Sequence, residues 1–279
     1  MVDFPAGLFL LLFTVAMLSL WWVPQTGRTA QVPWFVFVMS LAVCLSQGWM
    51  RPLALLWLVL LVISVWQFRQ TQLLAIQNWQ HFLSLAGVIV ISLGLATHSL
   101  PGFTPIPVLA EATYRNLDKA CVAFVLLALL LPRMRQWREF GDAVSVTWWL
   151  FLISPVVMFS LAWLVGGIDN VGFGVPQYFW LWAWGNLLVT CVAEELFFRG
   201  LLQRYLVTQW REKRWGWPVA LCLVSLLFGL VHLGGGWQFA LLATVAGAFY
   251  GAVYHMSGRI EMAILLHFFI NLLYVMLRS

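Results

Sequence analysis

The amino-acid sequence of 279 residues contains little charge. Asp, Glu, Lys and Arg make up 9% of it, while 63% of the residues are hydrophobic. A soluble globular domain has about 25% charged residues, so the composition excludes an ordinary soluble protein. The net charge of +5 does not indicate a nucleic-acid partner, because the basic residues lie in short connectors between apolar runs.

Cysteine is also scarce. The four cysteines lie within apolar runs, and no two of them form a CxxC pair. This pattern predicts neither a disulfide framework nor a cysteine-based metal site. We therefore expect all four to be small apolar packing residues: Cys44, Cys121, Cys191 and Cys222.

Apolar runs fill most of the chain instead. A transmembrane helix requires about 20 mostly apolar residues. We expect an all-α, polytopic integral membrane helix bundle with about 8–10 transmembrane helices, so that the lipid bilayer is its constant partner. The ten candidate runs are 6–23, 32–47, 52–67, 81–97, 119–131, 144–165, 178–207, 217–233, 237–256 and 260–277.

Lys and Arg gather on alternate connectors between these runs. They are densest at residues 133–138 and 204–214. Because cytoplasmic loops carry an excess of Lys and Arg, we expect these two connectors to face the cytoplasm and both termini to lie outside.

One apolar run is interrupted by charge at Glu194, Glu195 and Arg199. A charged side chain in hydrocarbon costs at least a few kcal/mol. Adjacent helical residues point about 100° apart, whereas Glu195 and Arg199 have the four-residue spacing at which side chains meet. The spacing predicts a structural Glu195–Arg199 pair and a less compensated Glu194 suited to acid–base chemistry. A purely structural ion cluster is the alternative.

Polar residues also interrupt the last apolar runs, at His232, His267 and Asn271. Lipid offers them no partner, so we expect them to turn inward toward the glutamates. The set then contains a base, two imidazoles and an amide, which suffices to activate water and stabilise an oxyanion. Each of these residues taken alone has a simpler, structural explanation, since an Asn, for example, commonly joins helices.

Gly247 and Gly251 have the small-xxx-small spacing of close helix packing.

The order of these motifs resembles that of the CPBP family. This family comprises the CAAX-processing and bacteriocin-processing (Abi) intramembrane endopeptidases and includes the type II CAAX prenyl proteases. The resemblance covers residues 185–274. The motifs that carry it lie on three separate predicted helices: Glu194-Glu195-x-x-x-Arg199, Phe228-x-x-x-His232 and His267-x-x-x-Asn271.

The resemblance implies a role for each motif residue. Glu194 and His232 activate the attacking water, and His267 and Asn271 form the oxyanion hole. The Glu195–Arg199 pair supports them. The implied enzyme is a CAAX-type intramembrane endopeptidase that hydrolyses a peptide bond in a membrane-associated protein or peptide, a lipidated CAAX-like substrate being one option.

The same resemblance divides the chain. Residues 144–279 are the expected catalytic transmembrane core, opening toward the cytoplasm, and residues 1–143 are N-terminal transmembrane helices of unassigned role. A straight helix from residue 217 would rise about 22 Å to His232, against about 15 Å between Arg204 and Glu194. A tilt, a late start or a re-entrant turn at Gly234–Gly236 would bring His232 to the depth of the glutamates. The sequence indicates neither the substrate nor the oligomeric state.

Three alternatives remain open at this point. Zinc bound by Glu194, His232 and His267 would give a metal-dependent protease, but the His-Glu-x-x-His signature is absent, so we expect no cofactor. A non-catalytic membrane protein for bacteriocin immunity or chaperoning would use the polar residues for structure alone. A transporter would use them as a proton relay, although no inverted repeats with broken helices are evident.

Overall fold

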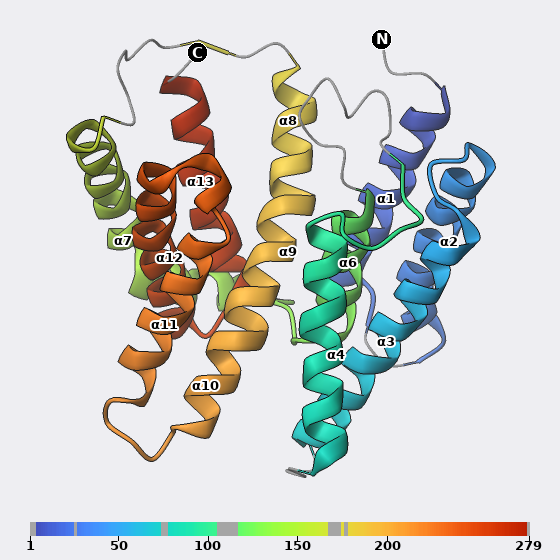
Figure 1. Cartoon of the computed structure of the whole chain (residues 1–279), viewed down its shortest axis with the longest axis horizontal. Coiled ribbons are helices and arrows are strands. Elements are labelled where there is room, and N and C mark those ends of the chain that lie inside the picture. The colour runs from blue at the N-terminus through green and yellow to red at the C-terminus, as the bar shows by residue number, and fades with distance from the viewer. Residues whose placement is uncertain are drawn as a thin grey trace. The chain divides into compact units, whose positions relative to one another are not determined.

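The computed structural model describes residues 4–24, 27–73, 78–104, 117–166, 174–175 and 178–277 (Figure 1). These parts are almost entirely helical, and an isolated bridge between Met50 and Phe103 is their only β-type pairing. Eight of the helices are long and apolar enough to cross a membrane. The chain is therefore an all-α, integral multi-pass membrane protein, as its composition predicts. Those eight are Phe4–Trp22, Thr29–Ser46, Pro52–Leu73, Trp79–Ala96, Trp137–Leu164, Phe179–Gln209, Trp237–Ser257 and Ile260–Leu277.

Two of the ten predicted spans are shorter than a full crossing. The run at 119–131 forms α6 (Leu117–Leu129), with 13 residues, and the run at 217–233 forms α11 (Gly216–Leu230), with 15. At 1.5 Å per residue these helices rise about 20 and 22 Å, against a hydrocarbon core of about 30 Å. The apolar pattern of α6 reflects burial in protein, because ten of its residues are buried.

One compact unit comprises residues 1–132 and 180–193. In it α1 (Phe4–Trp22) packs on α2 (Val32–Ser46), and α3 (Pro52–Leu73) packs on α4 (Trp79–Ala96). The buried α6 contacts α1, α3 and α4, and Phe124 of α6 stacks on Phe37 of α2 with ring centroids 3.9 Å apart. This unit holds none of the predicted site residues.

The other compact unit comprises residues 133–179 and 194–279. Its α11 and α12 (Trp237–Ser257) form an antiparallel hairpin, and α12 also packs against α7 (Trp137–Leu164) and α13 (Ile260–Leu277). Gly258 ends α12 with φ +65°, the left-handed conformation in which glycine commonly terminates helices. This unit contains all six predicted site residues.

Of the long helix Phe179–Gln209, residues 180–193 belong to the first unit, and Phe179 and residues 194–209 belong to the second. Its labelled parts α8 (Phe179–Gly185), α9 (Val192–Glu195) and α10 (Arg204–Gln209) follow one another in Figure 1. Between them lie two π-helical segments, η2 (Asn186–Cys191) and η3 (Leu196–Gln203). Wider π turns are rare and occur often at functional sites, and these two flank the paired glutamates. The functional division predicted at residues 143 and 144 stays a prediction.

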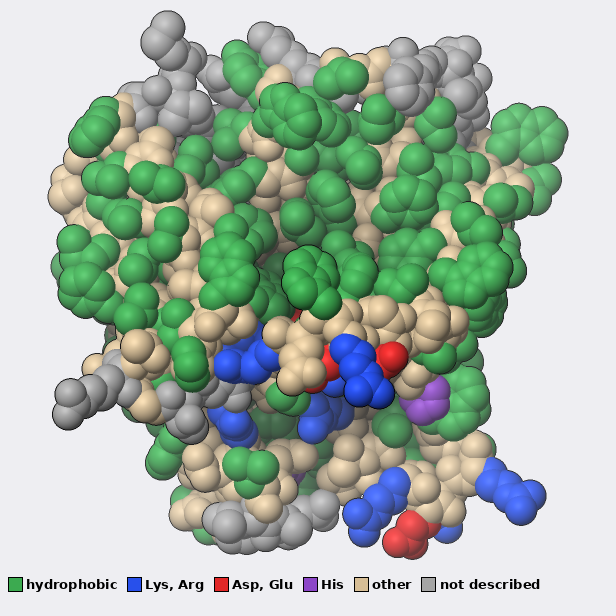
Figure 2. Space-filling model, turned by 180° about the vertical axis from the view of Figure 1, so that it is seen from behind, with side chains coloured by type: hydrophobic (Ala, Val, Ile, Leu, Met, Phe, Trp, Pro, Cys, Tyr) green, Lys and Arg blue, Asp and Glu red, His purple; other side chains and the backbone are tan. Residues whose placement is uncertain are grey.

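Large hydrophobic side chains are exposed along the outer helices. On α7 they include Trp148, Leu152 and Val156, each more than half exposed. Figure 2 shows hydrophobic side chains over most of one face, with Lys and Arg toward its lower edge. This distribution suits a surface in contact with lipid, since a soluble protein rarely exposes apolar patches of such extent.

Candidate active site

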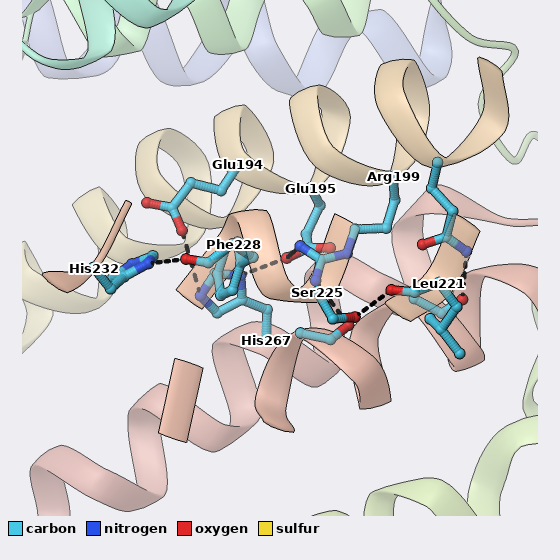
Figure 3. Close-up of polar contacts among 11 residues, drawn as sticks. Glu194, Glu195, Arg199, Leu221, Ser225, Phe228, His232 and His267 are labelled. Atoms are coloured by element: carbon cyan, nitrogen blue, oxygen red, sulfur yellow. Dashed lines mark hydrogen bonds and ion pairs between the residues drawn. The ribbon is translucent and has the colours of Figure 1, made fainter. Parts of the chain in front are cut away.

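Four of the six predicted site residues form one connected polar cluster (Figure 3). Glu194 and Glu195 end α9, Arg199 lies in η3 and His267 lies in α13. The cluster is built from two helices whose polar residues are separated by about 70 positions in sequence. The structure thus brings together the first and third motifs.

Glu195 and Arg199 form a fully buried ion pair, as their four-residue spacing predicts. Nη1 of Arg199 lies 3.1 Å from Oε1 of Glu195, and both side chains have no solvent exposure. The guanidinium also donates through Nη2 to the carbonyl of Gly247, at 2.8 Å. Its carbon Cζ lies 4.6 Å from the centre of the Phe228 ring, a cation–π contact. Several groups therefore share the charge of Arg199.

Gly247 and Gly251 allow helix η3 to approach α12 closely. A Cβ atom at Gly247 would lie 3.1 Å from Nη2 of Arg199, and one at Gly251 would lie 2.5 Å from Oε1 of Gln203. Gln203 is buried and donates to the carbonyl of Gly251 at 2.9 Å. The two glycines therefore expose backbone carbonyls to polar side chains as well as pack helices.

Gln203 is a polar residue of this helix face that was not predicted as part of the site. A signal was available, because Glu195, Arg199 and Gln203 follow one another at four-residue intervals. A third polar residue at this spacing in an apolar run belongs to the same helix face.

His267 connects the two glutamates. Its Nδ1 lies 2.7 Å from Oε1 of Glu195, and its Nε2 lies 3.9 Å from Oε2 of Glu194. Oε1 of Glu195 also accepts from Arg199, so one carboxyl oxygen contacts both the guanidinium and the imidazole. Glu195 is thus held by one cation and one imidazole.

Glu194 lies in different surroundings from its neighbour. Its side chain is 15% exposed, whereas that of Glu195 has no exposure. In Figure 3 the carboxylate of Glu194 points toward His267, while that of Glu195 points toward Arg199. The two adjacent carboxylates therefore differ in exposure, and Glu194 is the more exposed one.

His232 lies beyond the end of α11, which ends at Leu230. Its Nδ1 is 2.7 Å from the carbonyl oxygen of Phe228. A carbonyl only accepts hydrogen bonds, so Nδ1 carries the proton and Nε2 of the neutral ring is the acceptor. The chain then turns through η4 (Leu233–Gly235) to Gly236, which has φ +96°. The depth of His232 in the membrane stays a prediction.

The Phe228 ring lies between the two imidazoles. Its centroid is 4.7 Å from that of His232 and 5.8 Å from that of His267. The second motif is thereby joined to the other two. Asn271 lies one turn beyond His267 on α13 and is partly exposed.

The described residues contain no group of three or more His, Cys, Asp or Glu side chains arranged to hold a metal ion. The zinc alternative at Glu194, His232 and His267 and the expectation of no cofactor both stay predictions. The four cysteines are free thiols.

Comparison with known protein families gives a match to this part of the chain. Residues 176–273 match the family model described as type II CAAX prenyl endopeptidase Rce1-like. The matched segment contains all three motifs. Searches of curated proteins and of solved structures gave no significant match. Over residues 176–273, the chain is similar to the CAAX protease (CPBP) family.

Proposed function

We propose that this protein is a glutamate-dependent intramembrane endopeptidase acting on a membrane-associated protein or peptide. The observation that carries the proposal is the inequality of two adjacent carboxylates. Glu195 is neutralised by Arg199 and His267, whereas Glu194 is partly exposed beside the Nε2 of His267. A structural ion cluster has no need for the second carboxylate, but hydrolysis needs a base.

The proposed first step is the attack of water on the scissile carbonyl. Glu194 accepts one proton from the water, and the oxygen of the water forms a bond to the carbonyl carbon. His232 orients the same water through Nε2, the nitrogen left as acceptor by the bond between Nδ1 and Phe228. The carbonyl π electrons move onto oxygen and produce a tetrahedral oxyanion.

His267 and Asn271 are the proposed donors to that oxyanion. Since Nδ1 of His267 is engaged by Glu195, donation to the substrate comes from Nε2. Glu194 then returns its proton to the leaving amine as the C–N bond breaks, which restores the carboxylate.

The proposed site opens toward the cytoplasm. In the compact unit that contains the site, Arg204 contacts Tyr254 near the end of α12, and Arg259 pairs with Glu139 at the start of α7. The exposed basic connection between α10 and α11 belongs to the same end, since Trp217 of α11 stacks on His255. The positive-inside rule supports a cytoplasmic assignment for this end.

The experiment that tests the proposal compares protein termini in membranes. Cells carrying the wild-type protein, Glu194→Gln or Glu212→Gln are analysed by mass spectrometry at matched expression. Glu212 is an exposed carboxylate in the connection between α10 and α11, and it is the matched control.

We expect one or more membrane proteins to be shortened in cells with wild type and Glu212→Gln, but intact with Glu194→Gln. Identical termini in all three would contradict the proposal. That result would favour a non-catalytic immunity or chaperone role, or transport.

A further inference from the structure

Tyr250 of α12 is a buried aromatic residue that belongs to none of the three sequence motifs. Only 1% of the residue is exposed. Its ring stacks on the imidazole of His267, with centroids 4.5 Å apart and planes inclined by 14°. The guanidinium carbon of Arg199 lies 5.4 Å from the same ring. Tyr250 therefore contacts two members of the polar cluster.

The stack restrains the torsion on which the contacts of His267 depend. Rotation about the bond between Cβ and the ring moves both nitrogens, and for histidine this torsion has broad minima. Nδ1 meets Glu195 at 2.7 Å and Nε2 faces Glu194 at 3.9 Å in only one orientation of the ring. A parallel aromatic ring against one face of the imidazole opposes its rotation.

Phe228 restrains the same imidazole from another direction. Its ring meets that of His267 nearly perpendicularly, at 86°, and meets Tyr250 at 81°. Phe228 is already part of the second motif. Tyr250 supplies the one parallel stack on His267 among the described aromatic contacts.

We propose that Tyr250 is a positioning residue for the reaction, an inference that rests on the proposed function. It acts through His267 by holding the imidazole in the plane that joins Glu195 to the reacting atoms. It acts through its ring, which makes the stack on His267.

The first test measures kcat and KM for cleavage of a farnesylated, internally quenched CAAX peptide by the purified full-length protein. Tyr250→Leu removes the ring and is expected to lower kcat about 10- to 100-fold, the scale of misplacement by about 1 Å, with KM unchanged. Tyr250→Phe keeps the ring and is expected to retain the wild-type kcat. Tyr254→Leu is the matched control, because Tyr254 lies one turn further on α12 and contacts Arg204.

Three results would overturn the proposal. These are a wild-type kcat for Tyr250→Leu, an equal loss for Tyr250→Phe, or an effect on KM alone. Tyr250→Met, which replaces much of the volume without a ring, serves as a second ringless variant. If neither ringless variant gives folded protein while Tyr250→Phe does, the ring is structural and the proposal fails.

A crystal structure of Tyr250→Leu separates this proposal from the proposed function. We expect the distance between Nδ1 of His267 and Oε1 of Glu195 to exceed hydrogen-bonding range, about 3.2 Å. An unchanged imidazole would overturn the role of Tyr250 whether or not the peptide is cut. Failure of the wild-type protein to cut the peptide would instead count against its activity on prenylated substrates.

Discussion

At the scale of single residues, the two adjacent carboxylates of the cluster differ in burial and in their partners. Glu195 and Arg199 are wholly buried and paired, while Glu194 reaches the edge of the protein interior. Removing one partner of a buried ion pair leaves the other charge uncompensated, and this costs more than losing the pair as a whole. Adjacent glutamates should therefore respond differently to the same substitution.

Glu195→Gln is expected to destabilise the protein far more than Glu194→Gln does. The first leaves buried Arg199 without its carboxylate, at a cost of about 3–5 kcal/mol. The second removes a partly exposed charge. Unfolding in detergent, followed by circular dichroism, measures both, and equal destabilisation would show that the two carboxylates are equally structural.

Chelation tests the zinc alternative at Glu194, His232 and His267. We expect treatment of the purified protein with a strong chelator, followed by its removal, to leave peptide cleavage at the untreated rate. The reason is that Glu194 supplies the base without a metal in the proposed mechanism. Inactivation that added Zn²⁺ reverses would instead establish metal dependence.

At the scale of helices, glycines decide how closely the polar residues approach their partners. Gly247 brings a backbone carbonyl within 2.8 Å of Arg199, and Gly236 allows the turn after His232 with φ +96°. The first glycine removes a steric obstacle, and the second adopts a backbone conformation that other residues avoid. Two substitutions to alanine test these separate reasons.

Gly247→Ala is expected to destabilise the protein by about 1–3 kcal/mol, the usual cost of overpacking. Its Cβ would lie 3.1 Å from Nη2 of Arg199 and 3.2 Å from Cδ1 of Phe228. Gly141→Ala in α7, where a Cβ meets nothing within 4 Å, is the control in the same unfolding measurement. A Gly247→Ala protein as stable as that control would show that the helices separate at little cost.

Gly236→Ala is expected to lower both stability and peptide cleavage. A residue other than glycine held at φ +96° and ψ 163° costs about 1–3 kcal/mol, and relief of that strain would shift the turn that carries His232. Gly234→Ala is the matched control two residues away, since its Cβ would enter open space. Equal activity of the two variants would mean that His232 does not depend on this turn.

At the scale of the whole molecule, orientation in the membrane decides which compartment supplies substrate. We expect Lys213→Cys, in a protein whose own cysteines are replaced by alanine, to react with a membrane-impermeant maleimide only in inside-out vesicles. Val175→Cys, in the connection between α7 and α8, is expected to react only in right-side-out vesicles. Both positions are in exposed connections, and the reverse pattern would place the site on the opposite side.

Much of the architecture follows from local sequence. The eight long helices are predictable because each apolar run is long enough to satisfy its own backbone hydrogen bonds in lipid. The Glu195–Arg199 pair is predictable as well, since a helix places residues four apart on one face. The inward grouping of His267 with the glutamates follows from the cost of polar groups in hydrocarbon.

Other features required the tertiary structure, because they depend on contacts between distant segments. An apolar run looks the same whether it faces lipid or protein, so the sequence did not reveal that α6 is buried. The bond between His267 and Glu195, the stack of Tyr250 on His267 and the carbonyl that Gly247 offers to Arg199 each join different helices. The sequence alone determined which polar residues turn inward toward one another. The packing of α12 and α13 on the long helix decided which of their atoms form contacts.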